Sequence, residues 1–232
     1  MQKVILLSVL YFVSFFAVAT PIEILSDGGF EATTTKNTEW PIPLVSIGQW
    51  SGDGFSIVSA ESGVNPLSGS GMYKFLGNNL IGGNHDTYQI IDVSAWATEI
   101  DAGTATIDYS AYFNSAGMVS GLGLSFWSLP AFSGSLSGYT TKLFDNFGNA
   151  TDADESTWEQ VSYTSISLDV NTRFVAFGLH SLTKNSGAYV DNASLTLNVA
   201  STEPQTPVPA PGVLSLFGLG LLVSAKRKKR QA

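Results

Sequence analysis

The chain has 232 residues, of which 11 are Lys or Arg and 19 are Asp or Glu, so its formal net charge is -8. Residues 20–209 hold all of the acidic side chains and only five of the basic ones. Such an acidic surface repels phosphate backbones, which excludes nucleic-acid binding. Hydrophobic residues make up 44% of the chain, enough for a folded core. The absence of Cys excludes disulfides and thiol catalysis. The chain has only two His residues, which makes a histidine-based metal site unfavourable.

Residues 1–19 have the three parts of a secretory signal peptide. Lys3 supplies the positive start, residues 4–16 form an apolar run, and Ala17-Val18-Ala19 is a small-x-small cleavage site. Cleavage there would make Thr20 the mature N-terminus. The alternative is a membrane anchor, which is less favoured because a transmembrane helix needs about 20 apolar residues.

Residues 20–201 are predicted to form one all-β domain, a single β-sandwich of the jelly-roll type. Short alternations of apolar and polar residues recur between turn-forming Gly, Asn, Ser and Asp. In the segment 104–113, for example, Ala105, Ile107 and Tyr109 fall on one face. The predicted strands are 22–25, 55–60, 72–76, 87–93, 104–113, 121–127, 139–144, 158–166, 173–180 and 189–199. This many short strands with turn signals between them is typical of a sandwich or jelly roll.

One short helix is predicted directly after the strand at 87–93. Asp92 or Ser94 can cap its N-terminus. Val93, Trp96 and Ile100 are spaced to share one face of that helix.

The C-terminal segment has three parts. Residues 202–211 form a Pro-rich spacer, residues 212–225 are apolar and uncharged, and residues 226–232 contain the basic run KRKKR. The apolar part predicts a short transmembrane helix that would span about 21 Å. The positive-inside rule keeps the basic end on the cytoplasmic side of the inner membrane and the domain on the other side. The alternative is a plain tail anchor.

This order of parts resembles the PEP-CTERM sorting tail of Gram-negative bacteria. Pro209-Ala210-Pro211 stands where that family has Pro-Glu-Pro, so Ala210 replaces the usual Glu. The resemblance implies that an exosortase-type membrane protease recognises the tail and releases or transfers the protein. It therefore implies an inner-membrane-anchored precursor and a mature form at the cell surface or outside the cell. The tail implies no particular activity.

Two short motifs at the ends of the domain carry a second resemblance. DGGFEA (27–32) and YVDNASLTL (189–197) are similar to the opening and closing motifs of bacterial galactose-binding-like jelly rolls, close to the F-box-associated type. In the similar modules a structural calcium sits where these ends meet, and the matching residues here are Glu31 and Asp191. Hard cations prefer such oxygen ligands. The alternative is that both carboxylates accept hydrogen bonds from turn amides.

Sugar binding needs exposed aromatic rings beside polar groups. Trp40 and Trp50 lie in a Pro/Gly-rich stretch and are the predicted ligand-stacking residues. Catalysis has little support, because no Gly-x-Ser-x-Gly elbow occurs. His85 and Asp86 are sequence neighbours that point in opposite directions on a strand, so adjacency alone does not make them an acid–base pair.

The sequence thus predicts an exported, non-enzymatic protein of the cell envelope or extracellular matrix that binds polysaccharide. Two alternatives stay open. One is a glycan hydrolase that uses two paired carboxylates. The other is a purely structural matrix protein with no ligand.

Overall fold

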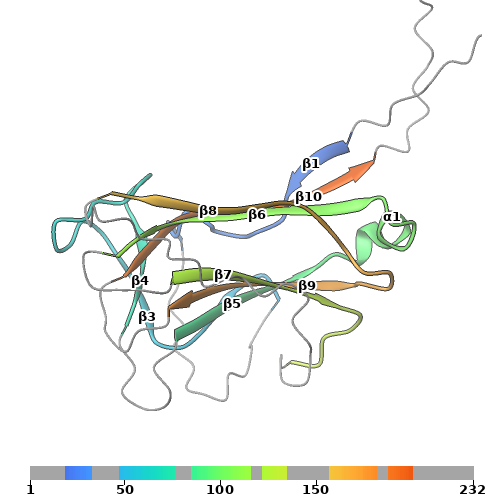
Figure 1. Ribbon diagram of the computed structural model, residues 1–232. Helices are drawn as coiled ribbons and strands as arrows, with labels where there is room; N and C mark the ends of the chain where they lie inside the picture. The colour runs from blue at the N-terminus through green and yellow to red at the C-terminus, as the bar shows by residue number, and fades with distance from the viewer. Residues whose placement is uncertain are drawn as a thin grey trace, which may run out of the picture. The chain divides into compact units, whose positions relative to one another are not determined.

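Two antiparallel sheets face each other across the main core (Figure 1). The computed structural model describes residues 19–32, 47–76, 85–115, 122–134, 157–181 and 188–200. Residues 18–200 form one compact unit. The second unit, residues 1–17 and 201–232, lies outside the described residues.

The larger sheet has six strands and the smaller one has four. The larger sheet has the order β3 (Phe55–Val58), β4 (Met72–Phe75), β10 (Tyr189–Ala200), β6 (Ala105–Asn114) and β8 (Glu159–Ser167), with β1 (Ala19–Glu23) also paired to β10. The smaller sheet has the order β2 (Trp50–Gly52), β5 (His85–Asp92), β9 (Phe174–Ser181) and β7 (Leu122–Leu129). The predicted all-β sandwich is confirmed. Strand β2 was not predicted, and the strand predicted at 139–144 lies outside the described residues.

Side-chain alternation along the strands builds the core between the sheets. In β6 the buried positions alternate with half-buried ones from Ala105 to Phe113, as the sequence pattern predicts. The largest fully buried aromatic side chains of this core are Phe30, Phe55, Tyr73, Phe75, Phe113, Phe126 and Phe177. Burying one such ring contributes about 1.5–3 kcal/mol, so this aromatic core is the main stabilising feature of the sandwich.

The predicted helix is confirmed between β5 and β6, where the chain crosses from the small sheet to the large one. It consists of η1 (Ser94–Trp96) and α1 (Ala97–Asp101). The Ser94 N–H donates to Asp92 Oδ1 at 2.8 Å, which satisfies a backbone donor at the start of the turn. Ile100 is fully buried and anchors the helix on the core.

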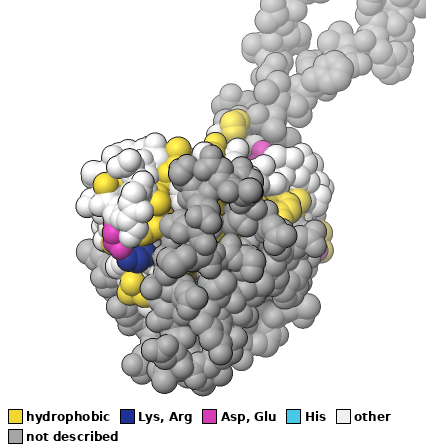
Figure 2. All heavy atoms as spheres, turned by 60° about the vertical axis from the view of Figure 1, so that its left-hand side comes forward, with side chains coloured by type: hydrophobic (Ala, Val, Ile, Leu, Met, Phe, Trp, Pro, Cys, Tyr) yellow, Lys and Arg dark blue, Asp and Glu magenta, His cyan; other side chains and the backbone are white. Residues whose placement is uncertain are grey.

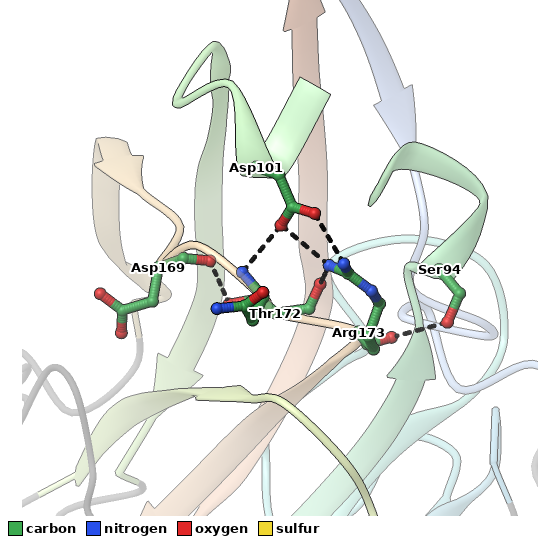
Figure 3. A network of polar contacts seen from close by, with 6 residues as sticks. Ser94, Asp101, Asp169, Thr172 and Arg173 are labelled. Atoms are coloured by element: carbon green, nitrogen blue, oxygen red, sulfur yellow. Dashed lines mark hydrogen bonds and ion pairs between the residues drawn. The ribbon is translucent and has the colours of Figure 1, made fainter. Parts of the chain in front are cut away.

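An ion pair ties this crossing to the segment that enters β9 (Figure 3). Arg173 Nη2 donates to Asp101 Oδ2 at 2.7 Å, and the Asn171 N–H donates to Asp101 Oδ1 at 2.8 Å. Ser94 Oγ donates to the Arg173 carbonyl at 3.4 Å from the other side. The bonds from Arg173 hold the pKa of Asp101 below its usual value. Two connections between the sheets are thereby joined at one end of the sandwich.

Several sequence-based predictions fall outside the described residues. They are the signal segment before Ala19, Trp40, the spacer at 202–211, the sorting motif Pro209-Ala210-Pro211, the apolar segment at 212–225 and the basic tail at 226–232. Within the part of the chain that the structure describes, no helix is long and apolar enough to cross a membrane.

Candidate functional site

The outer face of the small sheet carries a second group of packed side chains. On β9, Phe177 and Leu179 belong to the main core, so the alternate positions Gly178 and His180 lie on the opposite face. The apolar part of this face consists of Tyr88, Ile90, Trp127, Leu129 and Ala176. Polar residues of three neighbouring strands continue the same face, and we call Asp86, Ser125 and His180 the outer-face array.

Sheet register brings the three residues of the outer-face array together. Asp86 of β5 lies directly opposite His180 of β9, and Ser125 of β7 lies opposite Gly178, two residues before His180. His180 Nδ1 is 2.5 Å from Asp86 Oδ1, and His180 Nε2 is hydrogen-bonded to Ser125 Oγ. The imidazole thus joins a carboxylate on one side to a hydroxyl on the other.

Aromatic rings and a glycine hold the imidazole in this orientation. The His180 ring centroid is 5.5 Å from that of Tyr88 and 6.1 Å from that of Trp127. A Cβ atom at Gly178 would lie 2.4 Å from Ser125 Oγ and 2.8 Å from His180 Nε2. No real Cβ tolerates such distances, so glycine at this position makes room for the contact between Ser125 and His180.

Further ionisable groups surround Asp86. The Asp86 N–H donates to Asp53 Oδ2 at 3.1 Å, and burial raises the pKa of Asp53. Burial also raises the pKa of Tyr88, and the nearby carboxylates of Asp86 and Asp53 add to that rise. On the opposite side of β5, burial lowers the pKa of His85. Asp86 is the solvent-facing member of its pair, since its side chain is 26% exposed and that of His180 is 8% exposed.

The predicted metal residues Glu31 and Asp191 meet one loop, residues 67–71. Glu31 accepts hydrogen bonds from the Ser70 N–H at 2.9 Å, the Gly71 N–H at 3.0 Å and Ser70 Oγ at 2.8 Å. Asp191 accepts from the Leu67 and Ser68 N–H groups at 2.8 and 3.0 Å. The two ends of the domain therefore converge here, and both carboxylates bind turn amides. Among the described residues, no group of three or more His, Asp or Glu side chains forms a metal site.

These hydrogen bonds and the degree of burial set the ionisation of the two carboxylates differently. The bond from the Gly71 N–H contributes most to lowering the pKa of the exposed Glu31. Burial raises the pKa of Asp191, and the negative charge of Glu31 adds to the rise. The Glu31 charge thus affects Asp191 directly, as expected for two carboxylates that share one loop.

The prediction that Trp50 is an exposed sugar-stacking ring is wrong. Trp50 is only 4% exposed and packs in the main core against Phe30 and Phe177, with ring centroids 5.4 and 5.9 Å away. Its Nε1–H donates to the Asp27 carbonyl at 3.2 Å. Trp50 lies on the short strand β2 and faces inward. The Pro/Gly-rich sequence around it is typical of a loop, so the strand was not predicted. Trp40 lies outside the described residues.

Sequence reasoning did not identify the outer-face array. It compared Asp86 with its neighbour His85, whereas the partner of Asp86 is His180, 94 residues further along the chain. Alternation along each strand could have assigned Asp86, Ser125 and His180 to faces. The pairing of β5 with β9 and of β9 with β7 was required to bring them into contact.

Comparisons with known proteins support the fold. The chain matches no family model and no curated protein. It is similar to the crystal structure of a Stig cyclase from Fischerella sp. TAU in complex with an indole compound, at 12% identity and a TM-score of 0.52, over 78% of this chain and 100% of that one. It also matches a family 16 carbohydrate-binding module at 14% identity, a TM-score of 0.42 and coverage of 74% and 98%. A xylan-binding domain of Paenibacillus barcinonensis Xyn10C matches at 13% identity, a TM-score of 0.42 and coverage of 81% and 100%. At such identities the likeness to the cyclase shows a shared fold and no shared activity.

Proposed function

We propose that the protein is an exported component of the cell envelope or extracellular matrix and that its β-sandwich binds polysaccharide. The observation that supports this proposal is the outer face of the small sheet, where the partly buried rings of Phe132 and Phe174 pack against the buried apolar cluster beside the outer-face array. Aromatic rings pack against the CH faces of sugars, and a solvent-facing carboxylate such as that of Asp86 accepts hydrogen bonds from sugar hydroxyls. Small-molecule sites commonly combine aromatic side chains with a few polar groups.

The charge of the chain favours a neutral polysaccharide. The formal net charge is -8, so an anionic polymer would be repelled. Charged side chains are sparse on the described surface that Figure 2 shows, and the basic group there lies beside an acidic one. The described ion pair of Lys74 and Glu61 likewise neutralises a Lys side chain. A neutral ligand needs no excess of positive charge.

Export follows from the two ends of the chain. The signal peptide at 1–19 directs secretion, and the spacer, apolar segment and basic tail over 202–232 resemble an exosortase-sorted terminus. In this proposal the inner membrane holds the precursor, and the mature form reaches the cell surface or the medium. The carboxylates of Glu31 and Asp191 hold a structural calcium in the same proposal, with oxygen ligands that suit it.

Glycan-array screening of the full chain in mild detergent, followed by calorimetry with the best neutral polysaccharide, tests the binding proposal. Phe132→Ala is expected to weaken binding at least about tenfold, which corresponds to roughly 1.4 kcal/mol. Tyr112→Ala is the matched control, because Tyr112 lies on β6 in the other sheet and is half-buried.

Two other results separate the alternatives. If the folded protein binds no glycan, the binding proposal fails and the structural matrix protein is favoured. If reducing sugar is released from a bound polysaccharide, the paired-carboxylate hydrolase is favoured instead.

A further inference from the structure

The outer-face array has the connectivity of an activated serine. We propose that Ser125 is a nucleophile, that His180 is its general base, and that the site hydrolyses short acyl esters. Asp86 is the positioning residue that orients His180. This activity goes beyond the proposed binding of polysaccharide and does not depend on it.

The hydrogen bonds define where the protons lie. A carboxylate only accepts hydrogen bonds, so the contact of 2.5 Å between Asp86 Oδ1 and His180 Nδ1 places the imidazole proton on Nδ1. In the neutral imidazole the lone pair is then on Nε2, and Ser125 Oγ–H donates to it. This is the arrangement in which an imidazole removes the proton of a serine hydroxyl.

The backbone holds the array with little freedom. Its three residues come from adjacent strands with continuous antiparallel pairing, from His85 to Asp92 and from Leu122 to Leu129. Gly178 leaves the space in which Ser125 Oγ and His180 Nε2 meet. The rings of Tyr88 and Trp127 pack against the imidazole. Sites on regular strands keep catalytic groups in a narrow range of geometry.

Burial limits the substrate. Ser125 is 4% exposed and His180 is 6% exposed, so a group that reaches Oγ must be small. We therefore assign an acetyl-sized acyl group, carried on an alcohol that remains outside. The more exposed Asp86 lies at the solvent-facing end of the array.

The reaction has two balanced steps. In the first, Ser125 Oγ attacks the ester carbonyl while its proton passes to His180 Nε2. The bond from carbonyl carbon to alcohol oxygen breaks, and the alcohol leaves with the proton from Nε2. In the second, His180 takes a proton from water, the hydroxide attacks the acyl-serine, and Nε2 returns the proton to Ser125 Oγ. The products are one carboxylic acid and one alcohol.

Active-site labelling of the full chain in mild detergent tests the proposal. Methanesulfonyl fluoride is small enough for a buried serine, and Oγ displaces fluoride from its sulfur while the proton goes to His180. Peptide mass spectrometry is expected to find the sulfonyl group on Ser125 in the folded protein and not after unfolding in urea. The other serines of the chain serve as internal controls. p-Nitrophenyl acetate is expected to be hydrolysed by the same preparation.

Variants separate chemistry from structure. Ser125→Ala is expected to abolish hydrolysis, and His180→Gln to reduce it by about 10²–10⁴-fold. Asp86→Asn is expected to change the pH profile of labelling, which a purely structural role would not do. Gly178→Ala displaces Ser125 Oγ and is expected to slow labelling. This variant therefore tests the proposal even when Ser125→Ala does not fold. Ser162→Ala, at an exposed position of β8, is the matched control and should behave as the parent protein.

A natively folded parent protein whose Ser125 is no more reactive than its other serines would overturn the proposal. Ester hydrolysis that persists undiminished in a folded Ser125→Ala variant would do the same.

Discussion

The turn at residues 27–31 shows how single backbone positions join the two ends of the domain. Asp27 and Phe30 have φ values of 50° and 56°, in the left-handed region that is unfavourable for such residues. Phe30 is nevertheless fully buried in the core. The Ala193 N–H donates to the Gly28 carbonyl at 2.9 Å, and the Asp27 carboxylate accepts the Glu31 N–H at 2.8 Å. Burial of the ring and these bonds offset the backbone strain.

Gly28 is expected to tolerate no side chain, whereas its neighbour Gly29 should. A Cβ at Gly28 would lie 1.9 Å from the Ala193 carbonyl oxygen, a backbone atom that cannot turn aside. A Cβ at Gly29 would have its nearest neighbour at 4.0 Å. Urea unfolding should show a loss of about 1–3 kcal/mol or more for Gly28→Ala and a change within about 0.5 kcal/mol for Gly29→Ala. Equal stability of the two variants would contradict the close approach of Gly28 to β10.

Glu31→Gln is expected to lower the melting temperature at neutral pH and to have little effect in acid. Hydrogen bonding lowers the pKa of Glu31 from 4.5, so its carboxylate stabilises the fold above that pH. The stabilisation is lost as the pH falls through the lowered pKa of the folded state. Thermal melts of both proteins at neutral pH and well below pH 4.5 check this. A difference that persists unchanged in acid would contradict it.

The same pair of proteins tests the proposed calcium. With calcium bound, the parent protein should melt at a higher temperature in excess calcium than in chelator, because a ligand that binds only the folded state stabilises it. Glu31→Gln should remove that difference. Identical melting temperatures of the parent protein in both buffers would contradict the calcium proposal. The amides of the loop 67–71 would then be the partners of both carboxylates.

At the scale of elements, the connections between the sheets matter as much as the strands. The helix α1 leads into β6, and the segment ending at Arg173 leads into β9, so the Asp101–Arg173 pair joins two crossings that are far apart in sequence. The pair is partly exposed, with side-chain exposures of 28% for Arg173 and 41% for Asp101, so solvent weakens it. Its bidentate geometry and the added bond from Asn171 favour a measurable effect.

Asp101→Asn is therefore expected to lower the melting temperature modestly at neutral pH. The pKa of Asp101 is lowered from 3.8 by Arg173, so the stabilisation is present above that pH and disappears as the pH falls through the lowered value. High salt should also reduce the difference between variant and parent, since it screens the ion pair. Asp92→Asn, which leaves an oxygen to accept the Ser94 N–H, is a control on the same crossing. An effect of Asp101→Asn that is independent of both pH and salt would assign it to packing.

At the scale of the whole molecule, the two proposed activities and the proposed sorting are separate properties. The proposed binding and ester hydrolysis would depend on the outer face of the small sheet, while the proposed sorting would depend on residues 202–232. Each basic residue of the KRKKR run costs about 2.5–3.5 kcal/mol to place at a membrane centre, so the run is expected to stay on the cytoplasmic side. In the proposed sorting, the Pro-rich spacer is expected to hold the sorting motif near the opposite surface.

Mass spectrometry of the mature protein from its native host tests the sorting. Processing predicts an N-terminus at Thr20, a C-terminus near Pro209 and loss of all five basic residues of the tail. Substituting Glu for Ala210 would restore the usual motif and should increase the processed fraction. A membrane-bound majority species that still ends at Ala232 would support the plain anchor.

Local patterns in the sequence were enough to predict the strands and the short helix of the sandwich. Alternation placed Ala105, Ile107 and Tyr109 on the buried face of β6, and the spacing of Val93, Trp96 and Ile100 located the one described helix. These patterns work because a pleated strand repeats every two residues and a helix about every 3.6, so neighbouring residues contain the information. The resemblance of the two end motifs to those of known jelly rolls also predicted that Glu31 and Asp191 lie close together, and both contact one loop.

Which distant residues meet depends on strand pairing, which local sequence patterns do not reveal. Trp50 entered the core because β2 pairs with β5, a contact that its Pro/Gly-rich surroundings did not indicate. Asp86 met His180, and His180 met Ser125, because β9 lies between β5 and β7 in the small sheet. Strand order and register arise from the packing of the whole chain, and a shift of one residue would turn each side chain to the opposite face. Local periodicity therefore defined the faces, and long-range pairing assembled the site.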